Sequence, residues 1–157
     1  EGQSFVFVVD YSGSMQGYRF SRARDELIRT LGDLTPQQKF FVIFYNHRAQ
    51  PMYASGKRMR LMPASPSTPR RTRRWINKQH PHGRTSPDIA LKMALEMKPD
   101  VIFFLSDGDF PRTARTVARE ANTHGTIIHT IAFEYDGGQV LLKGIAEDNH
   151  GRYRFVN

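Results

Sequence analysis

Cysteine is absent from the 157-residue sequence, which excludes disulfides and thiolate metal sites but leaves the cellular compartment open. Long apolar runs are missing too: the longest have the length of a strand, and none approaches a membrane span. The sequence begins at Glu1, with neither an initiator Met nor a signal-like segment before the first apolar run. We therefore expect one monomeric domain over residues 1–157, cut from a longer protein, and the sequence assigns it no localisation.

Acidic residues are missing from one long stretch. Between Asp33 and Asp88 the chain has no Asp or Glu but many Lys and Arg, several of them in the Arg-rich segment 57–74, and the whole chain has a formal net charge of +8. A one-sided field of this kind attracts acidic proteins, polyanions or nucleic acid. Solvated basic faces that keep a domain soluble give the same pattern. The charge distribution therefore leaves the role of this segment open.

The sequence itself alternates strand-sized apolar runs with helical patterns. Strands are predicted at 5–9, 40–45, 101–105, 126–133 and 153–156, and helices at about 20–34, 69–79, 87–97, 112–121 and 140–146. Thr68 before Pro69 looks like a helix cap followed by proline at the first helical position. In the segment 49–61, Pro51 and Gly56 restrict any strand to the edge of a sheet. This order predicts a three-layer α/β/α, Rossmann-like doubly wound fold, with a mostly parallel sheet and an antiparallel edge strand.

Two of the predicted strands end on carboxylates. Asp10 ends the first strand and Asp107 follows the central one, in each case directly before turn residues. In a doubly wound sheet, sites form beyond the carboxyl ends of the strands where the winding direction reverses, and if these two strands are neighbours at that point, the two aspartates face each other across one crevice. Ser12, Ser14 and the loop with Thr85 would lie on its rim. Two carboxylates brought together repel, and a cation relieves that repulsion.

The ligands available in this crevice are hard oxygens from Asp, Ser and Thr. With no Cys and no His pair among them, they favour Mg²⁺, with Mn²⁺ as a substitute and Ca²⁺ less favoured, and they argue against Zn²⁺. An octahedral ion held in this way would keep positions filled by water, one of which a carboxylate from elsewhere could take. Capping of a helix N-terminus is the alternative role for Asp10 and the two serines. Asp109 is expected to cap the helix entered at Pro111.

Three motifs give the sequence a family resemblance. The stretch DYSGSM at 10–15 resembles the Asp-x-Ser-x-Ser motif of von Willebrand factor type A (vWA) domains. Thr85, in Gly-Arg-Thr before a predicted helix, matches the family's lone loop threonine, and Asp107, in Leu-Ser-Asp-Gly, matches its later aspartate. Together these positions compose the family's metal-ion-dependent adhesion site (MIDAS). The resemblance covers essentially the whole chain.

The resemblance implies a role for each of these residues. Ser12 and Ser14 would bind the metal directly, Asp10 and Asp107 directly or through a bound water, and Thr85 in one of the family's two states. It also implies a domain that is not an enzyme. In such domains the bound metal captures a Glu or Asp side chain of a protein partner.

The sequence departs from the family pattern at two points. Arg84 stands before the loop threonine where glycine is common, which would place a cation beside the metal. Such a cation would steer an acidic partner or weaken the metal affinity by like-charge repulsion. The sequence also stops without the C-terminal helix whose displacement switches some members of the family, so switching is left unassigned.

Three other readings of the sequence compete with metal-dependent binding. Phosphatases of the haloacid dehalogenase type place a second Asp two residues after the first, but Ser12 stands there, and the loop lacks the glycines and Lys of a P-loop. The arginines from 58 to 74, with Tyr53 and Trp75, superficially fit a nucleic-acid patch. Because Trp75 lies on the apolar face of its helix, we expect it to anchor the core, and we do not expect nucleic acid as the partner. A vWA scaffold with an unused metal site is the third alternative.

Overall fold

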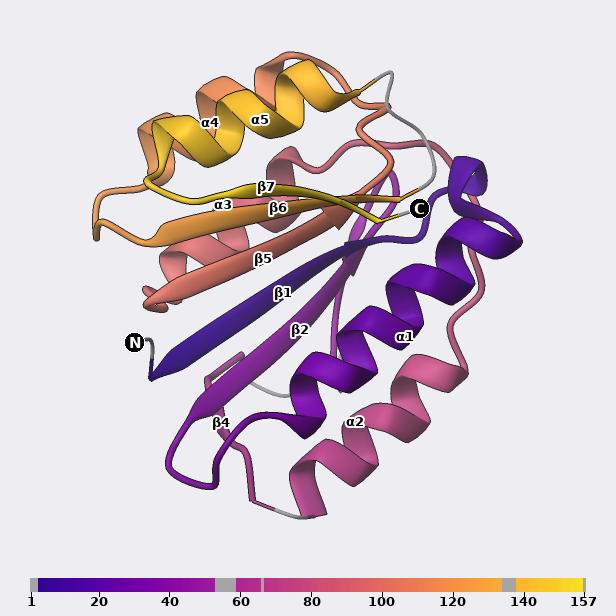
Figure 1. The fold of residues 1–157 in the computed structure, drawn as a ribbon, viewed down its shortest axis with the longest axis vertical. Coiled ribbons are helices and arrows are strands. Elements are labelled where there is room, and N and C mark those ends of the chain that lie inside the picture. Colours follow the sequence, from indigo (N-terminus) through magenta and orange to yellow (C-terminus); the bar gives the residue numbers. More distant parts are fainter. Residues whose placement is uncertain (1–2, 53–58, 66, 134–137, 157) are drawn as a thin grey trace.

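In the part of the chain that the structure describes, seven strands form one sheet between two layers of helices (Figure 1). The computed structural model describes residues 3–52, 59–65, 67–133 and 138–156. The strands are β1 (Ser4–Asp10), β2 (Lys39–Tyr45), β3 (Ala49–Pro51), β4 (Met62–Pro63), β5 (Val101–Ser106), β6 (Ile127–Phe133) and β7 (Tyr153–Val156). The helices are the short 3₁₀ helix η1 (Gly13–Met15) and α1 (Tyr18–Gly32), α2 (Ser67–Asn77), α3 (Asp88–Glu96), α4 (Thr113–Ala121) and α5 (Gln139–Asp148).

The order of the strands places the winding reversal at β1. Along the sheet the order is β3-β2-β1-β5-β6-β7, with β4 paired to β2. β1 runs parallel to both β2 and β5, and β6 and β7 continue the parallel sheet, whereas β3 and β4 are antiparallel to β2. The chain therefore leaves β1 for β2 on one side and returns to β5 on the other, which confirms the predicted doubly wound fold.

Strands β1 and β2 are covered on both faces. Helices α1 and α2 lie on one side of the sheet, and α3, α4 and α5 lie on the other (Figure 1). Because of this double cover, residues 6–10 of β1 and 40–45 of β2 are all buried, which explains their continuous apolar sequences. Trp75 of α2 packs its ring 5.1 Å from that of Phe44, so its predicted role as a core anchor is confirmed.

The helices agree with their predicted positions to within two residues at either end. Helix α2 begins at Ser67, so Thr68 and Pro69 lie inside its first turn and the predicted cap at Thr68 is wrong. Pro69 is tolerated in the first turn because the first four N–H groups of a helix have no acceptor within it, so a residue without an N–H loses no hydrogen bond there. Among the described residues, no helix has both the length and the apolar character that crossing a membrane requires.

The predicted edge strand is present but short. β3 spans three residues and pairs antiparallel with β2, with Pro51 opposite Ile43. Residues 53–58, which include Gly56, lie outside the described residues. β4 pairs with the start of β2 in the same antiparallel sense, so two short pieces of chain share this edge of the sheet.

Candidate metal-binding site

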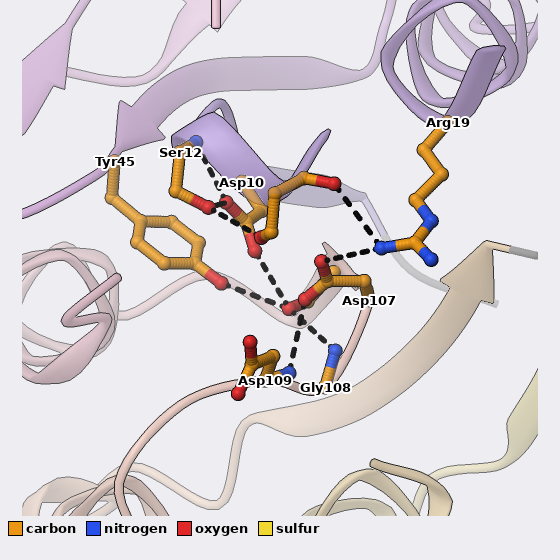
Figure 2. Close-up of polar contacts among 9 residues, drawn as sticks. Asp10, Ser12, Arg19, Tyr45, Asp107, Gly108 and Asp109 are labelled. Atoms are coloured by element: carbon orange, nitrogen blue, oxygen red, sulfur yellow. Dashed lines mark hydrogen bonds and ion pairs between the residues drawn. The ribbon is translucent and has the colours of Figure 1, made fainter. Parts of the chain in front are cut away.

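The first loop of the site follows β1. Asp10 is the last residue of that strand and is fully buried. Its Oδ1 accepts hydrogen bonds from the backbone N–H of Ser12 at 2.9 Å and from the hydroxyl of Ser12 at 2.6 Å. The hydroxyl of Ser14 lies 3.1 Å from that of Ser12, and because the Ser12 proton goes to Asp10, Ser14 is the donor in this pair. Figure 2 shows Ser12 turned back toward Asp10.

These side chains do not cap a helix. Ser12 is the N-cap residue of η1 and α1 follows Gly17, and neither helix start has a side-chain capping hydrogen bond. The capping alternative for Asp10 and the serines is therefore wrong. The predicted cap at Asp109 is wrong as well, because α4 begins further along the chain without a side-chain cap. Asp109 instead donates its backbone N–H to Oδ1 of Asp107 at 2.9 Å.

Ser106, at the end of β5, holds the second oxygen of Asp10. Its hydroxyl donates to Asp10 Oδ2 at 3.0 Å and accepts hydrogen bonds from the Tyr45 hydroxyl at 3.1 Å and from the backbone N–H of Gly108 at 3.0 Å. The one proton and both lone pairs of this hydroxyl are thus used. Since Tyr45 and Ser106 are fully buried, the two strands that flank β1 together fix the orientation of Asp10.

Asp107 is held from two sides and is fully buried. Its Oδ1 accepts the N–H of Asp109, and its Oδ2 lies 3.3 Å from the guanidinium of Arg19, which also donates to the backbone oxygen of Ser14 at 3.1 Å. Figure 2 shows Arg19 reaching from α1 to Asp107. The sequence pointed instead to Arg84, an exposed residue in the loop before α3, as the cation near the site.

The loop before α3 brings Thr85 to the same edge of the sheet. In this loop the backbone oxygen of Gly83 accepts a hydrogen bond from the backbone N–H of Gly13 at 2.8 Å. Two further backbone hydrogen bonds, from the N–H groups of His82 and Ser86, tie the loop to the residues that follow β1 and β2. Thr85 is half-buried between these anchors.

Burial dominates the electrostatics of Asp10. It raises the pKa of this carboxyl from 3.8 to about 6, because desolvation penalises the charged form. The hydrogen bonds from Ser12 lower the pKa and the nearby charge of Asp107 raises it. Burial, and then the charge of Asp10, also raises the pKa of Tyr45 well above 10, so its hydroxyl remains a protonated donor.

The structure thus brings most of the predicted residues together. Asp10, Ser12 and Asp107 are buried at one edge of the sheet, with Ser14 on the exposed side. Within the described ranges, no three His, Asp or Glu side chains gather as a metal-binding group, so the candidate consists of two carboxylates and several hydroxyls. The sequence analysis missed three residues with contacts in the site: Arg19, Tyr45 and Ser106.

The sequence contains an indication for two of these missed residues but not for the third. Tyr45 and Ser106 each end a buried strand next to β1, so the rule that singled out Asp10 applies to them too. Arg19 has no such signal, because it is one basic residue among several on α1.

The fold and the site together define a doubly wound α/β domain with its polar residues gathered where β1 and β5 end. A family profile described as "von Willebrand factor type A domain" matches residues 3–155. The chain belongs to this family of protein-interaction modules.

Curated relatives with similar sequences are heavy chains of the inter-alpha-trypsin inhibitor. Heavy chain H4 from Homo sapiens is 28% identical over 174 aligned positions, which cover 99% of this chain and 18% of the relative. Heavy chain H2 from Mesocricetus auratus is 28% identical over 169 positions, which cover 95% of this chain and 17% of the relative. The chain thus spans less than a fifth of the length of these proteins.

Similar solved structures have low sequence identity and show the fold alone. A von Willebrand factor type A protein from Catenulispora acidiphila has a TM-score of 0.85 at 17% identity, over all of this chain and 39% of that one. The pilus adhesin SpaC from Lactobacillus rhamnosus GG, in its open conformation, has a TM-score of 0.80 at 13% identity, over all of this chain and 28% of that one.

Proposed function

We propose that this domain is a metal-dependent protein-binding module. In this proposal Asp10, Ser12, Ser14, Thr85 and Asp107 hold Mg²⁺, or Mn²⁺ in its place, as a MIDAS. The bound ion would supply a positive centre with coordination positions left for an acidic side chain of a partner protein. The observation that carries the proposal is the convergence of two fully buried carboxylates with serine hydroxyls at one edge of the sheet.

The donor chemistry of the loop after β1 fits a divalent ion. The Ser12 hydroxyl donates its only proton to Asp10, so its lone pairs remain for a hydrogen atom or a cation. One lone pair accepts the proton of Ser14, which is itself an exposed residue. Carboxylate and hydroxyl oxygens are the ligands that Mg²⁺ prefers.

The proposed activity is binding rather than catalysis. A serine nucleophile needs a neighbouring general base that accepts its proton and is itself oriented by a third group. Asp10 accepts the Ser12 proton, but both side chains are completely buried, so the Ser12 oxygen has no open face from which to attack a substrate. Asp10 is also held on both oxygens, by Ser12 and by Ser106, which orients it as a ligand.

The direct test is unfolding by heat and by urea in Mg²⁺ and in EDTA. For the parent domain, ion at about a hundred times its dissociation constant should add about 2.7 kcal/mol to the free energy of unfolding. Asp107→Ala should lose this Mg²⁺-induced increment, because one of the two carboxylates is gone. Asp109→Ala is the matched control, since Asp109 is exposed and contacts Asp107 only through its backbone N–H. A parent domain whose stability is the same in Mg²⁺, Mn²⁺ and EDTA contradicts the proposal.

A further inference from the structure

A guanidinium already lies at the carboxylates of the proposed metal site. Nη1 of Arg19 is 3.3 Å from Oδ2 of Asp107 and 3.1 Å from the backbone oxygen of Ser14 (Figure 2). The side chain of Asp107 is completely buried, whereas that of Arg19 is 30% exposed. One end of this ion pair is therefore fixed in the interior, while the other end comes from the surface of α1.

The ion pair has opposite effects before and after a divalent ion binds. Without the ion, Arg19 offsets one of the two negative charges of Asp10 and Asp107, and its removal would leave a buried carboxylate without a counter-ion. With the ion bound and both carboxylates charged, the formal charge of the site rises from −1 to +1. The guanidinium then repels the ion with which it shares Asp107.

We propose that Arg19 is the built-in counter-ion of the metal-free site, which stabilises Asp107 before the ion binds and lowers the affinity of the site for the ion. This inference rests on the proposed metal site. Since Arg19 acts through Asp107, it is a positioning and tuning residue rather than a ligand. The positive charge that it leaves on the loaded site also favours an anionic partner group over a neutral one.

The test compares calorimetric titrations of Mg²⁺ and Mn²⁺ into four proteins: the parent, Arg19→Gln, Arg19→Lys and Arg29→Gln. Arg19→Gln should bind both ions at least about fivefold more tightly, which is the lower end of ordinary coupling between two sites. Arg19→Lys keeps the positive charge and should stay close to the parent. Arg29→Gln is the matched control, because Arg29 lies on the same helix and also has an acidic partner, Glu26, at 2.6 Å.

Unfolding provides a second readout that does not depend on heats of binding. In EDTA, Arg19→Gln should unfold at a lower temperature than the parent, and in saturating Mg²⁺ the difference should shrink or reverse.

If the parent binds the ions and Arg19→Gln binds them equally or more weakly, the counter-ion role is wrong while the metal site stands. If Arg19→Lys behaves like Arg19→Gln, charge is not the cause and the inference is overturned. If neither the parent nor Arg19→Gln binds an ion, the proposed metal site fails, and this inference fails with it.

Discussion

Asp10 accepts three hydrogen bonds, and yet its pKa is raised. Two come from Ser12 and one from Ser106, and each stabilises the charged form. Complete burial and the neighbouring charge of Asp107 act in the opposite direction and outweigh them. The hydrogen bonds hold the Asp10 carboxyl in one orientation but do not fully stabilise its negative charge, and a bound cation would stabilise that charge.

The raised pKa of Asp10 predicts how the stability of the metal-free domain depends on pH. Between pH 3.8 and about 6 the folded carboxyl keeps its proton while the unfolded one has lost it, so folding takes up a proton and becomes less favourable as the pH rises. The free energy of unfolding should therefore fall by about 3 kcal/mol across this window from this group alone. Urea unfolding in EDTA at several pH values measures it.

Asp10→Asn isolates this contribution from those of other acids. The stability of the parent minus that of Asp10→Asn should drop as the pH rises through the window and stay level above it. Three carboxylates outside the site have lowered pKa values, and because they act on both proteins alike, they cancel in the difference: Glu26, Asp100 and Asp148. A difference that is flat from pH 3.5 to 7 would mean that Asp10 is not protonated in this range.

At the scale of elements, the site depends on how closely two loops approach. Gly83 has φ +81°, and a Cβ built on it would lie 2.7 Å from Nδ1 of His47. Its backbone oxygen accepts the N–H of Gly13. A side chain at Gly83 would therefore be strained in its backbone and would collide with His47, which follows β2, so the backbone contact of Gly83 with Gly13 would have to shift.

Gly83→Ala should destabilise the domain by roughly 1–3 kcal/mol and reduce the stabilisation by Mg²⁺. Gly125→Ala is the matched control, because Gly125 has φ +79° but no atom within 4 Å of its added Cβ. It should cost about 1–2 kcal/mol for its backbone conformation and keep the full response to Mg²⁺. Unfolding in Mg²⁺ and in EDTA measures both effects. Equal Mg²⁺ responses in the two variants would show that the loop approach does not matter for the site.

Local sequence predicted the existence of the elements better than their ends. The helical spacing that starts at Phe20 predicted α1, and double cover by helices explains why β1 and β2 are apolar throughout. The caps predicted at Thr68 and Asp109 were wrong, because several residues near a helix start can satisfy the same local pattern. Which one begins the helix depends on packing that the local sequence does not contain.

At the scale of the whole molecule, the excess of positive charge should affect the rate at which the domain meets an acidic partner rather than the binding of the metal. The formal net charge is +8, and Arg70, Arg73 and Arg74 are exposed on α2. Long-range attraction of this kind raises association rates with acidic partners and weakens as salt screens it. Coordination to a metal is a short-range interaction that a chelator removes.

A triple change of Arg70, Arg73 and Arg74 to Gln separates the two contributions. With a poly-glutamate peptide as the probe in Mg²⁺, the variant should associate up to roughly tenfold more slowly at low salt and with a weaker dependence on salt. It should keep the sensitivity to EDTA of the parent. Surface plasmon resonance measures both. Peptide binding that ignores EDTA and follows salt alone would support the polyanion-binding alternative instead.

The sequence by itself determined the order of strands and helices and the positions of five oxygen-bearing residues. Apolar periodicity depends on local residues, and in a doubly wound sheet polar residues after a strand fall at one edge. The shared crevice of Asp10 and Asp107 depended on their strands being neighbours, and the pairing of β1 with β5 meets that condition.

Only the tertiary structure decided which charged groups meet at that edge of the sheet and how strongly Asp10 holds its proton. The contact of Arg19 with Asp107 joins residues 88 positions apart, and that of Tyr45 with Ser106 joins residues 61 apart. The raised pKa of Asp10 depends on the atoms that surround it on all sides. Burial and non-local pairing are properties of the packed molecule, and for that reason the protonation and the internal counter-ion of the site could not be derived from the pattern of residues along the chain.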